Sequence, residues 1–219
     1  MEIELGRTTV ELLPGRAVFL KGSRSLVVAD IHLGKSATFR NRGLPVPEGT
    51  TESDLRRLSQ LVETNLPSQL IIAGDLVHSA DGLSEPILSS LGDFLADLPI
   101  PVILTEGNHD ARAWISGRKL PFHIVADLLV DGITITHDPS DLAPNQPGIA
   151  GHLHPGARIA ESRRRAIRVP GFFLQASQHL ILPAFSEFTG IHPMTCRKND
   201  RFFAEMSGKI SEIPRQLIR

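Results

Sequence analysis

An alternation of apolar segments between residues 25 and 104 constrains the fold more than any other feature of this sequence. Three short apolar runs predict strands at Ser25–Asp30, Gln69–Ala73 and Val102–Leu104. Between them, apolar residues recur on one helical face from Thr51 or Ser53 to about Thr64, and again after Ser84, the expected N-cap of a second helix. Strands and helices that alternate in this way are typical of a parallel sheet covered by helices, so we expect an α/β fold.

The remainder of the chain is rich in expected strands. Those before residue 25 are Glu2–Leu5, Val10–Leu13 and Ala17–Leu20. Those after residue 125 are Leu128–Val130, Ile133–Thr136, Phe172–Gln175, Gln178–Leu182 and Arg201–Met206. The pair Asp131-Gly132 predicts a hairpin with a type I′ turn, and Pro139–Pro147 is expected to be a loop.

Size and composition favour one soluble domain. A chain of 219 residues is long enough to bury its own core, so a single domain over 1–219 is expected. The single cysteine, Cys196, excludes a disulfide framework and a cysteine-based zinc finger, and favours a reducing, cytoplasmic setting. No apolar run reaches the roughly 18 residues of a membrane span, and the first residues do not resemble a signal peptide. We therefore expect no membrane association.

Charge is balanced overall but unevenly distributed. The net charge is −1, with −6 in residues 1–110 (9 basic, 15 acidic) and +5 in residues 111–219 (14 basic, 9 acidic). An acidic half suits cations and a basic half suits a polyanion. The alternative is an uneven surface without a function.

Five short polar motifs follow predicted strands. They contain Asp30-Ile31-His32, Gly74-Asp75, Gly107-Asn108-His109-Asp110, His137-Asp138 and Gly151-His152-Leu153-His154. Ligand sites in open α/β sheets form beyond the carboxyl ends of strands, so all five are expected at one edge. A single histidine after a strand is more often structural than a ligand, but five of the nine histidines fall in these motifs. Chance explains that concentration poorly.

The motifs supply nitrogen and oxygen ligands without sulfur. The candidate metal ligands are Asp30, His32, Asp75, Asn108, His137, His152 and His154. Seven such groups are too many for one tetrahedral ion, but they suit two ions about 3.5–4 Å apart that share a carboxylate. Imidazole and carboxylate suit manganese, iron or zinc. The sequence therefore predicts two divalent cations and leaves the choice among manganese, iron and zinc open.

Local spacing gives a geometric reason for this grouping. On an extended strand, residues i and i+2 share a face, so Asp30 would lie beside His32, and His152 beside His154. Glycine precedes Asp75, Asn108 and His152, and a glycine permits positive φ and close approach of the backbone.

In this order, the motifs resemble the signature of the calcineurin-like metallophosphoesterases. More narrowly, DIHLGKSATFRNRGLPVPEGT (30–50), AGDLVHS and GHLHP resemble the ligase-associated metallophosphoesterases of bacteria, the PdeM type. The resemblance covers about residues 10–195. It implies a four-layer α/β/β/α sandwich of two mixed sheets flanked by helices, and a phosphodiesterase or endonuclease linked to DNA repair. It also implies an ATP-dependent DNA ligase and a DEXH helicase as associated proteins.

The resemblance also implies roles for the ligands. Asp30, His32 and His154 would hold one ion, Asn108, His137 and His152 the other, and Asp75 would bridge them. The chain departs from the family at Asp138, where glycine is frequent, and at His78, where aspartate is frequent. Asp138 would narrow that side or add negative charge, and His78 would face the site, lie behind it or lie at the surface.

His109 and Asp110 are the expected catalytic residues. A water activated between the two ions would attack phosphorus, and the His109 imidazolium would protonate the leaving oxygen. Asp110 would orient His109 and raise its pKa.

Basic residues near the motifs suggest a substrate. Lys35, Arg40 and Arg42 are expected to hold phosphates that flank the scissile one, the alternative being a solvated loop. Arg163–Arg165 and Arg168 are more typical of a solvated hairpin turn than of contacts along a nucleic acid backbone. Phe172 and Phe173 favour core packing over base stacking, and Trp114 is equally compatible with core and pocket.

Two other functions remain open from the sequence. One is a small-molecule phosphatase or cyclic-nucleotide phosphodiesterase. The other is a non-catalytic scaffold on the same fold, although none of the expected ligands is missing. The residues do not distinguish DNA from RNA or a small diester, internal from terminal cleavage, or one oligomeric state from another.

Overall fold

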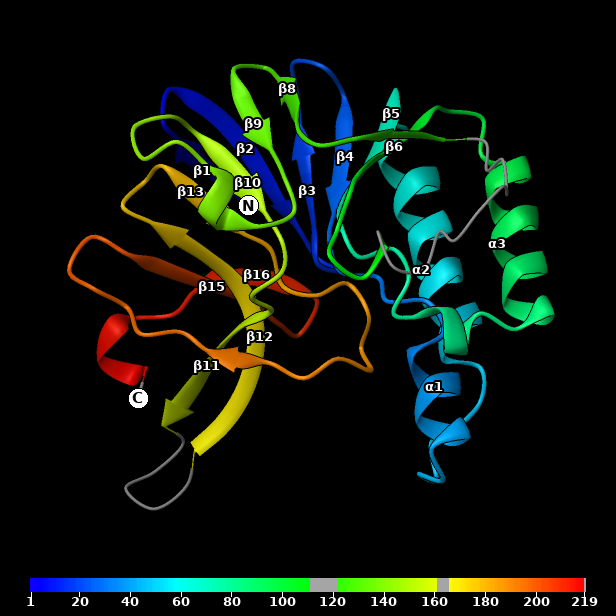
Figure 1. The fold of residues 1–219 in the computed structure, drawn as a ribbon. Coiled ribbons are helices and arrows are strands. Elements are labelled where there is room, and N and C mark those ends of the chain that lie inside the picture. Colours follow the sequence, from blue (N-terminus) through cyan, green and yellow to red (C-terminus); the bar gives the residue numbers. More distant parts are fainter. Residues whose placement is uncertain (111–121, 161–165, 219) are drawn as a thin grey trace.

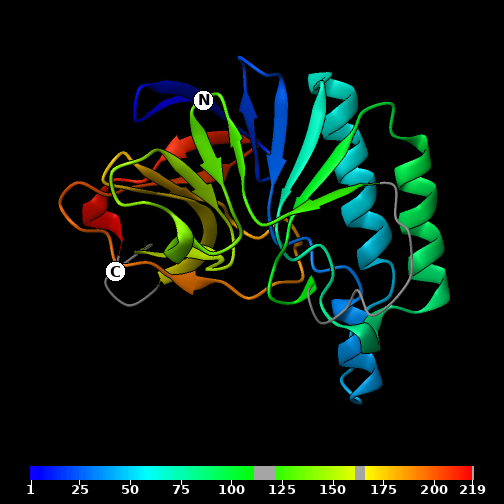
Figure 2. The same cartoon turned by 45° about the horizontal axis from the view of Figure 1, so that its top comes forward.

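Two mixed β-sheets face each other in the computed structural model, which describes residues 1–110, 122–160 and 166–218. Helices α2 and α3 cover the outer face of the first sheet, and α1 projects beyond its end (Figures 1 and 2). This confirms the expected α/β sandwich of two mixed sheets.

The first sheet contains seven strands in chain order. They are β1 (Glu2–Leu5), β2 (Thr8–Leu13), β3 (Ala17–Leu20), β4 (Ser25–Val28), β5 (Gln69–Ala73), β6 (Val102–Thr105) and β7 (His123–Val125). Strands β1 to β4 form an antiparallel meander, and β4 to β7 are parallel. Helices α1 (Lys35–Asn41) and α2 (Thr50–Asn65) connect β4 to β5, and α3 (Glu85–Asp97) connects β5 to β6. The expected alternation over 25–104 is therefore confirmed.

The second sheet contains nine strands. They are β8 (Leu128–Val130), β9 (Ile133–Ile135), β10 (Gly148–Ala150), β11 (Pro155–Ala160), β12 (Ala166–Gln175), β13 (His179–Ile181), β14 (His192–Pro193), β15 (Arg201–Met206) and β16 (Lys209–Glu212). Their order is β14-β11-β12-β13-β10-β9-β8, with β15 beside β12 and β16 beside β15. Short 3₁₀ turns occupy Ala80–Gly82, Pro139–Asp141 and Arg215–Leu217.

Alternation along the strands divides the apolar core between the faces of the sheets. In the first sheet, Leu26 and Leu70 pack under α2 and α3, whereas Val27 and Ile71 point into the space between the sheets. There they meet residues of the second sheet, including Phe172. Each sheet thus contributes one apolar face to a shared core.

The outer face of the second sheet carries a third apolar cluster. Phe173, Phe202 and Ile181 point to this face and pack with Leu142 and Ile213, which come from connecting segments and the C-terminal region. Among the described residues all three α-helices precede residue 98, so loops cover this face where the resemblance implied a helical layer.

Several element boundaries differ from the predictions. The strand predicted to reach Asp30 ends at Val28, and Gly49, rather than Thr51 or Ser53, is the N-cap of α2. Helix α1 and strands β7, β10, β11, β14 and β16 were not predicted. Strands β7, β10 and β14 have only two or three residues, and α1, β11 and β16 lack a continuous apolar pattern. The type I′ turn is confirmed by φ values of 52° at Asp131 and 78° at Gly132.

Within the described part of the chain, no helix is both long and apolar enough to cross a membrane.

Candidate metal centre

All five polar motifs meet where the two sheets adjoin. Those of the first sheet follow the carboxyl ends of the parallel strands β4, β5 and β6. Those of the second sheet follow β9 and lie between β10 and β11, where the side chains of His154 and His137 contact the carboxylates after β4 and β5. The convergence expected from strand topology is what the structure shows.

The backbone that presents these side chains is left-handed rather than extended. The φ values are 54° at Asp30, 50° at His32, 50° at Asp75, 67° at His152 and 46° at His154. The prediction that strand alternation pairs Asp30 with His32 was therefore wrong in its geometry, although the residues do meet. Positive φ at a non-glycine residue is strained, and such strain concentrates at functional sites.

Backbone hydrogen bonds hold these turns in place. The N–H of Asp30 donates to the carbonyl of Gly74 (3.1 Å), and the N–H of His32 donates to the carbonyl of Asp75 (2.9 Å). The motif after β4 is thereby fixed against the motif after β5. On its other side, the N–H of Phe185 donates to the carbonyl of Ala29 (2.8 Å).

One group of ligand atoms comprises Asp30, His32 and His154. Nε2 of His32 and Nε2 of His154 lie 3.0 Å apart, and Nε2 of His154 lies 3.5 Å from Oδ1 of Asp30. Asp30 is fully buried and His32 nearly so. These residues are the ones that the resemblance implied for the first ion.

A second group comprises Asp75, His137 and His152. Nε2 of His137 lies 3.0 Å from Nδ1 of His152 and 2.9 Å from Oδ1 of Asn108. Asn108, His137 and His152 are the residues that the resemblance implied for the second ion, and Asp75 is the aspartate that it implied for both ions.

Asp75 lies between the two groups. Its Oδ2 is 3.6 Å from Nε2 of His137 in one group and 3.9 Å from Nε2 of His32 in the other. The groups are also joined by the N–H of His152, which donates to both carboxylate oxygens of Asp30 (3.1 and 2.9 Å). A single buried carboxylate thus faces both sets of imidazoles.

The electrostatics of this cluster suit bound cations. Burial raises the pKa of Asp75, although His137 opposes this effect. Burial, with the charge of Lys35, lowers the pKa of His32 far below its usual range, so His32 is in the neutral form that binds metal. Buried carboxylates and facing imidazole nitrogens are a donor set that fits two divalent cations.

Glycines allow the motifs to approach this closely. A Cβ on Gly74 (φ 76°) would lie 2.1 Å from Nδ1 of His137, and a Cβ on Gly107 would lie 2.2 Å from Oδ1 of Asp75. The sequence argument for glycine before these motifs therefore holds through close packing, with positive φ required at Gly74.

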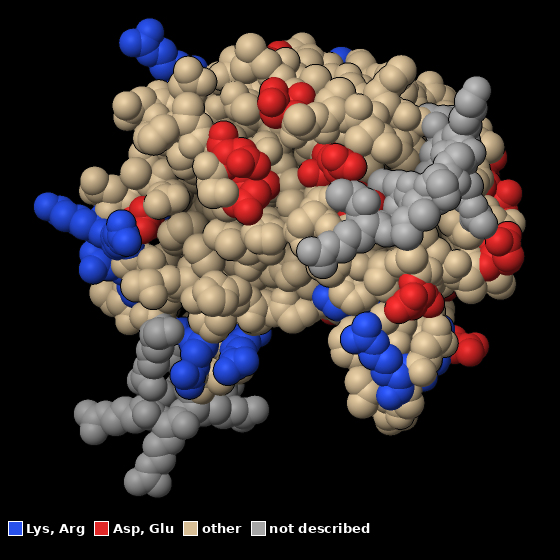
Figure 3. Space-filling model, viewed as in Figure 1, with Lys and Arg blue, Asp and Glu red and all other residues tan. Residues whose placement is uncertain are grey.

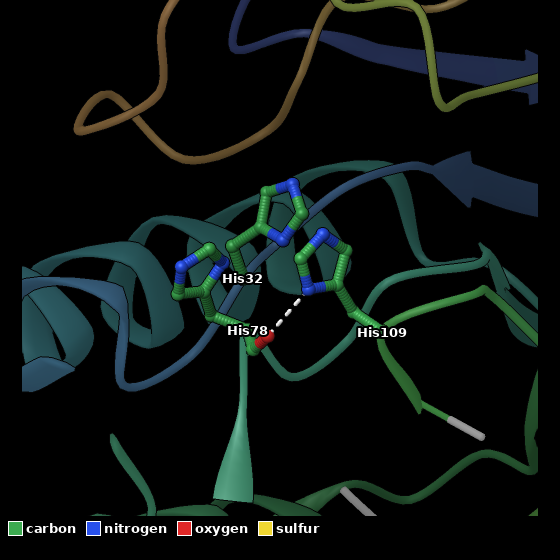
Figure 4. Close-up of side chains that lie close together, drawn as sticks. All are labelled: His32, His78 and His109. Carbon is green, nitrogen blue, oxygen red and sulfur yellow. Dashed lines mark hydrogen bonds between the residues drawn. The ribbon is translucent and has the colours of Figure 1, made fainter. Parts of the chain in front are cut away.

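His109 lies beside the metal cluster with its ring partly open to solvent (Figure 4). The backbone N–H of His109 donates to Oδ1 of Asp75 (2.9 Å), and the ring atom Nε2 lies 4.0 Å from Oδ2 of the same carboxylate. The ring stacks on His78, with centroids 4.9 Å apart, and meets the edge of His32. A substrate held by the cluster can therefore reach Nε2 of His109.

The His109 ring is oriented by a different group from the one predicted. Nδ1 lies 2.5 Å from the carbonyl oxygen of His78, so Nδ1 donates its proton there. Asp110 is fully buried, and its carboxylate accepts the N–H groups of Leu76, Val77 and Gly107. Burial raises its pKa to about 7. Asp110 thus ties the turn after β5 to the turn after β6 instead of holding the ring.

His78 is a site residue whose position the sequence left open. Its ring lies among His32 and His109, and the three rings offer nitrogen atoms within 4.8 Å of one another (Figure 4). Burial lowers the pKa of His78 to about 4, so this imidazole is neutral at pH 7. The available signal was its place three residues after Asp75.

The three expected substrate-binding cations differ in position. Lys35 is partly buried at the start of α1, where the charges of Asp30 and Asp75 act on it. Arg40 donates to the carbonyl of Pro47 (2.9 Å), away from the cluster, and Arg42 is exposed at the end of α1. The structure brings Lys35 to the metal cluster, and the charge of Arg42 acts on His78 at its edge.

The remaining candidates divide clearly. Phe172 and Phe173 are buried on opposite faces of β12, as expected for core residues. Asp138 lies 3.8 Å from Nε2 of His152 through Oδ2, so it adds negative charge beside the second group. Trp114 and Arg163–Arg165 lie outside the described residues.

The chain is similar to known proteins in sequence and in fold. The family model for calcineurin-like phosphoesterases matches residues 23–155. The crystal structure of Pseudomonas putida nuclease MPE matches with a TM-score of 0.82 and 29% identity, covering 97% of this chain and 99% of that one. The structure of Yfce, a phosphoesterase from E. coli, matches with a TM-score of 0.43 and 14% identity, covering 89% and 99%.

No curated protein matches the chain. The family match spans more than half of the chain and includes every residue of the metal cluster, from Asp30 to His154. The chain therefore belongs to the calcineurin-like phosphoesterase family, whose members are metal-dependent hydrolases of phosphate esters.

Proposed function

We propose that this protein is a two-metal phosphodiesterase that cleaves nucleic acid. One observation carries the proposal: the buried Asp75 carboxylate lies between two separate groups of metal-ligating atoms. The proposed ligands are Asp30, His32 and His154 for one ion, Asn108, His137 and His152 for the other, and Asp75 for both. Manganese is the proposed ion, with iron or zinc as alternatives, because imidazole and carboxylate suit all three.

The protein positions the reacting groups. Bound divalent cations would supply an activated water and neutralise charge on the phosphoryl oxygens. Nδ1–H of His109 donates a hydrogen bond to the carbonyl of His78, and this contact directs Nε2 toward the metal cluster. In the imidazolium form, Nε2 donates a proton to the leaving oxygen. Lys35 adds a positive charge on the same side, where a flanking phosphate would lie.

Nucleic acid is the substrate class best supported. The P. putida structure, a nuclease, covers nearly the whole chain at 29% identity. Two further proposals rest on the sequence of residues 30–50: a role in DNA repair, and association with an ATP-dependent ligase and a DEXH helicase. Action in the cytoplasm is proposed from the single cysteine, and a single domain from the length of the chain. The second candidate substrate is a small phosphate ester, whose hydrolysis would require neither a nucleic acid strand nor these partner proteins.

Hydrolysis of a substrate panel tests the proposal. Protein supplied with Mn²⁺ should hydrolyse bis-nitrophenyl phosphate faster than nitrophenyl phosphate, and should cut single-stranded DNA, duplex DNA or RNA. Asp75→Ala should lose both activities and bound metal, whereas Asp93→Ala, an exposed acid on α3, should change neither. Retention of two ions by Asp75→Ala would contradict the shared carboxylate. Activity on monoesters alone would favour the small phosphatase.

A further inference from the structure

Two arginines lie directly opposite each other on neighbouring strands. In the antiparallel pairing of β11 with β12, Arg158 is the register partner of Arg168, and both are exposed. Directly opposed side chains on one face have Cβ atoms about 4.5–5.5 Å apart, so like charges there are destabilising. The fold therefore keeps two positive charges together without a benefit to its own stability.

Neither charge is neutralised by the rest of the described chain. Within residues 1–110, 122–160 and 166–218, no carboxylate pairs with Arg158 or Arg168. The sequence around them is itself basic, since residues 158–168 contain five arginines and one glutamate. A negatively charged partner from outside the chain would relieve the repulsion.

The arginines lie on the face of their strands that packs against the first sheet farther along β12. Residues two apart on a strand share a face, so Arg168 shares its face of β12 with Phe172 and Leu174. Those two side chains are buried in the core between the sheets. Arg168 is exposed, so β12 extends past the first sheet and leaves the same face open there.

This open face is close to the metal ligands along the chain. Strand β11 begins one residue after His154, so Arg158 lies four residues beyond a ligand, about 13 Å along an extended strand. On the other side of the cluster, α1 begins three residues after His32 and carries Lys35, Arg40 and Arg42. Both segments project from the same edge of the molecule (Figure 1).

The surface between these projections is indented. In Figure 3, Lys and Arg side chains lie on both projections, and the edge of the molecule is notched between them. A polyanion that crosses the notch would contact basic side chains on both of its sides. Sugar–phosphate contacts of this kind set the register of a nucleic acid strand without reading its sequence.

We propose that the face of β11 and β12 formed by Arg158 and Arg168 binds the sugar–phosphate backbone of a nucleic acid strand a few nucleotides from the bond that is cut. The inference rests on the proposed function, because it requires a polynucleotide at the metal cluster. It adds a binding position that a small phosphate ester cannot reach.

Salt dependence provides the test. For a single-stranded nucleic acid, log affinity falls with log salt, and each lost phosphate contact makes this slope about 0.7 less steep. The double variant Arg158→Gln/Arg168→Gln should therefore make it about 1.4 less steep. Binding of a fluorescent 20-nucleotide strand is measured by anisotropy in EDTA, which prevents cleavage. The kcat/KM for bis-nitrophenyl phosphate, measured with Mn²⁺, should stay at the wild-type value.

Two further variants separate binding from folding. Arg168→Glu places a negative charge on β12 opposite Arg158 on β11, so it should raise Tm. The same change should weaken binding of the 20-nucleotide DNA or RNA. Arg7→Gln is the matched control, because Arg7 is exposed in the turn between β1 and β2, at the end of the first sheet opposite to the ligand-bearing turns. Its salt slope should equal that of the wild type.

The outcomes distinguish this inference from the proposed function. If the wild-type protein binds the 20-nucleotide strand and the double glutamine variant binds it with the same salt slope and affinity, the inference is overturned. The proposed function would still stand. Hydrolysis of bis-nitrophenyl phosphate by a wild-type protein that neither binds nor cuts the 20-nucleotide strand would overturn both. A Tm that falls in Arg168→Glu together with affinity would also count against it.

Discussion

Replacement of Gly107 by alanine should disable the metal centre from a residue that donates no ligand atom. The added Cβ would lie 2.2 Å from Oδ1 of Asp75 and 2.3 Å from its backbone nitrogen. Ordinary contact begins at 3.4 Å, so these atoms must separate by about 1.2 Å. Asp75 is almost fully buried between the two ligand groups, so the carboxylate cannot move without leaving at least one of them.

The magnitude follows from that displacement. A misplacement of about 1 Å can reduce turnover by about 100-fold, and overpacking of a core site destabilises by about 1–3 kcal/mol. Gly107→Ala should therefore lose about 100-fold in kcat/KM on bis-nitrophenyl phosphate and bind fewer than two ions per chain. Turnover, metal content by elemental analysis and urea unfolding are measured on the same preparation.

Gly92→Ala is the matched control. Gly92 lies within α3, and an added Cβ there meets nothing within 4 Å. Alanine should raise the free energy of unfolding by about 0.5–1 kcal/mol and leave turnover unchanged. Wild-type turnover with two bound ions in Gly107→Ala would refute the reasoning from close packing.

Three other measurements follow from the same structure. His109→Ala should keep both ions but lose about 10²–10⁴-fold in turnover on diesters with poor leaving groups, and less on nitrophenyl esters. Equal losses on both would argue against proton donation by Nε2. Mn²⁺ at about 100 times its Kd should stabilise the protein by about 2.7 kcal/mol per site, seen as a rise in Tm that Asp75→Ala removes. A Tm indifferent to Mn²⁺ would contradict a buried site. Arg57 pairs with the buried Asp54 (3.2 Å), so Arg57→Ala should cost about 2 kcal/mol in urea unfolding, whereas the exposed neighbour Arg56→Ala should change it by less than about 0.5 kcal/mol. Equal effects of the two arginine variants would show that the pair contributes nothing.

The position of Asp110 changes how the catalytic turn is understood. A carboxylate next to a catalytic histidine in sequence suggests a direct contact with the imidazole. Here it accepts three backbone N–H groups from two turns, while a backbone carbonyl holds the ring. Its contribution is to keep Asp75 and His109 at a constant separation, because both turns are tied to one carboxylate.

Local pattern determined much of the fold. Apolar periodicity between residues 25 and 104 predicted β4, α2, β5, α3 and β6, since each is long or apolar enough to show its own period. The Asp131-Gly132 turn was also readable, because its two positive φ values demand particular residues. Helix α1 and strands β10, β11, β14 and β16 of the second sheet were not, because tertiary contacts rather than periodicity stabilise them.

The sequence by itself also determined which residue types gather, since five strand-end motifs supply only imidazole, carboxylate and amide groups. Only the tertiary structure decided which of them touch. His32 meets His154 across 122 residues, and this contact depends on how the two sheets pack, which no local spacing records. The left-handed turns, the carbonyl behind His109 and the open face of Arg158 and Arg168 were decided in the same way. Each arises where separate segments constrain one another.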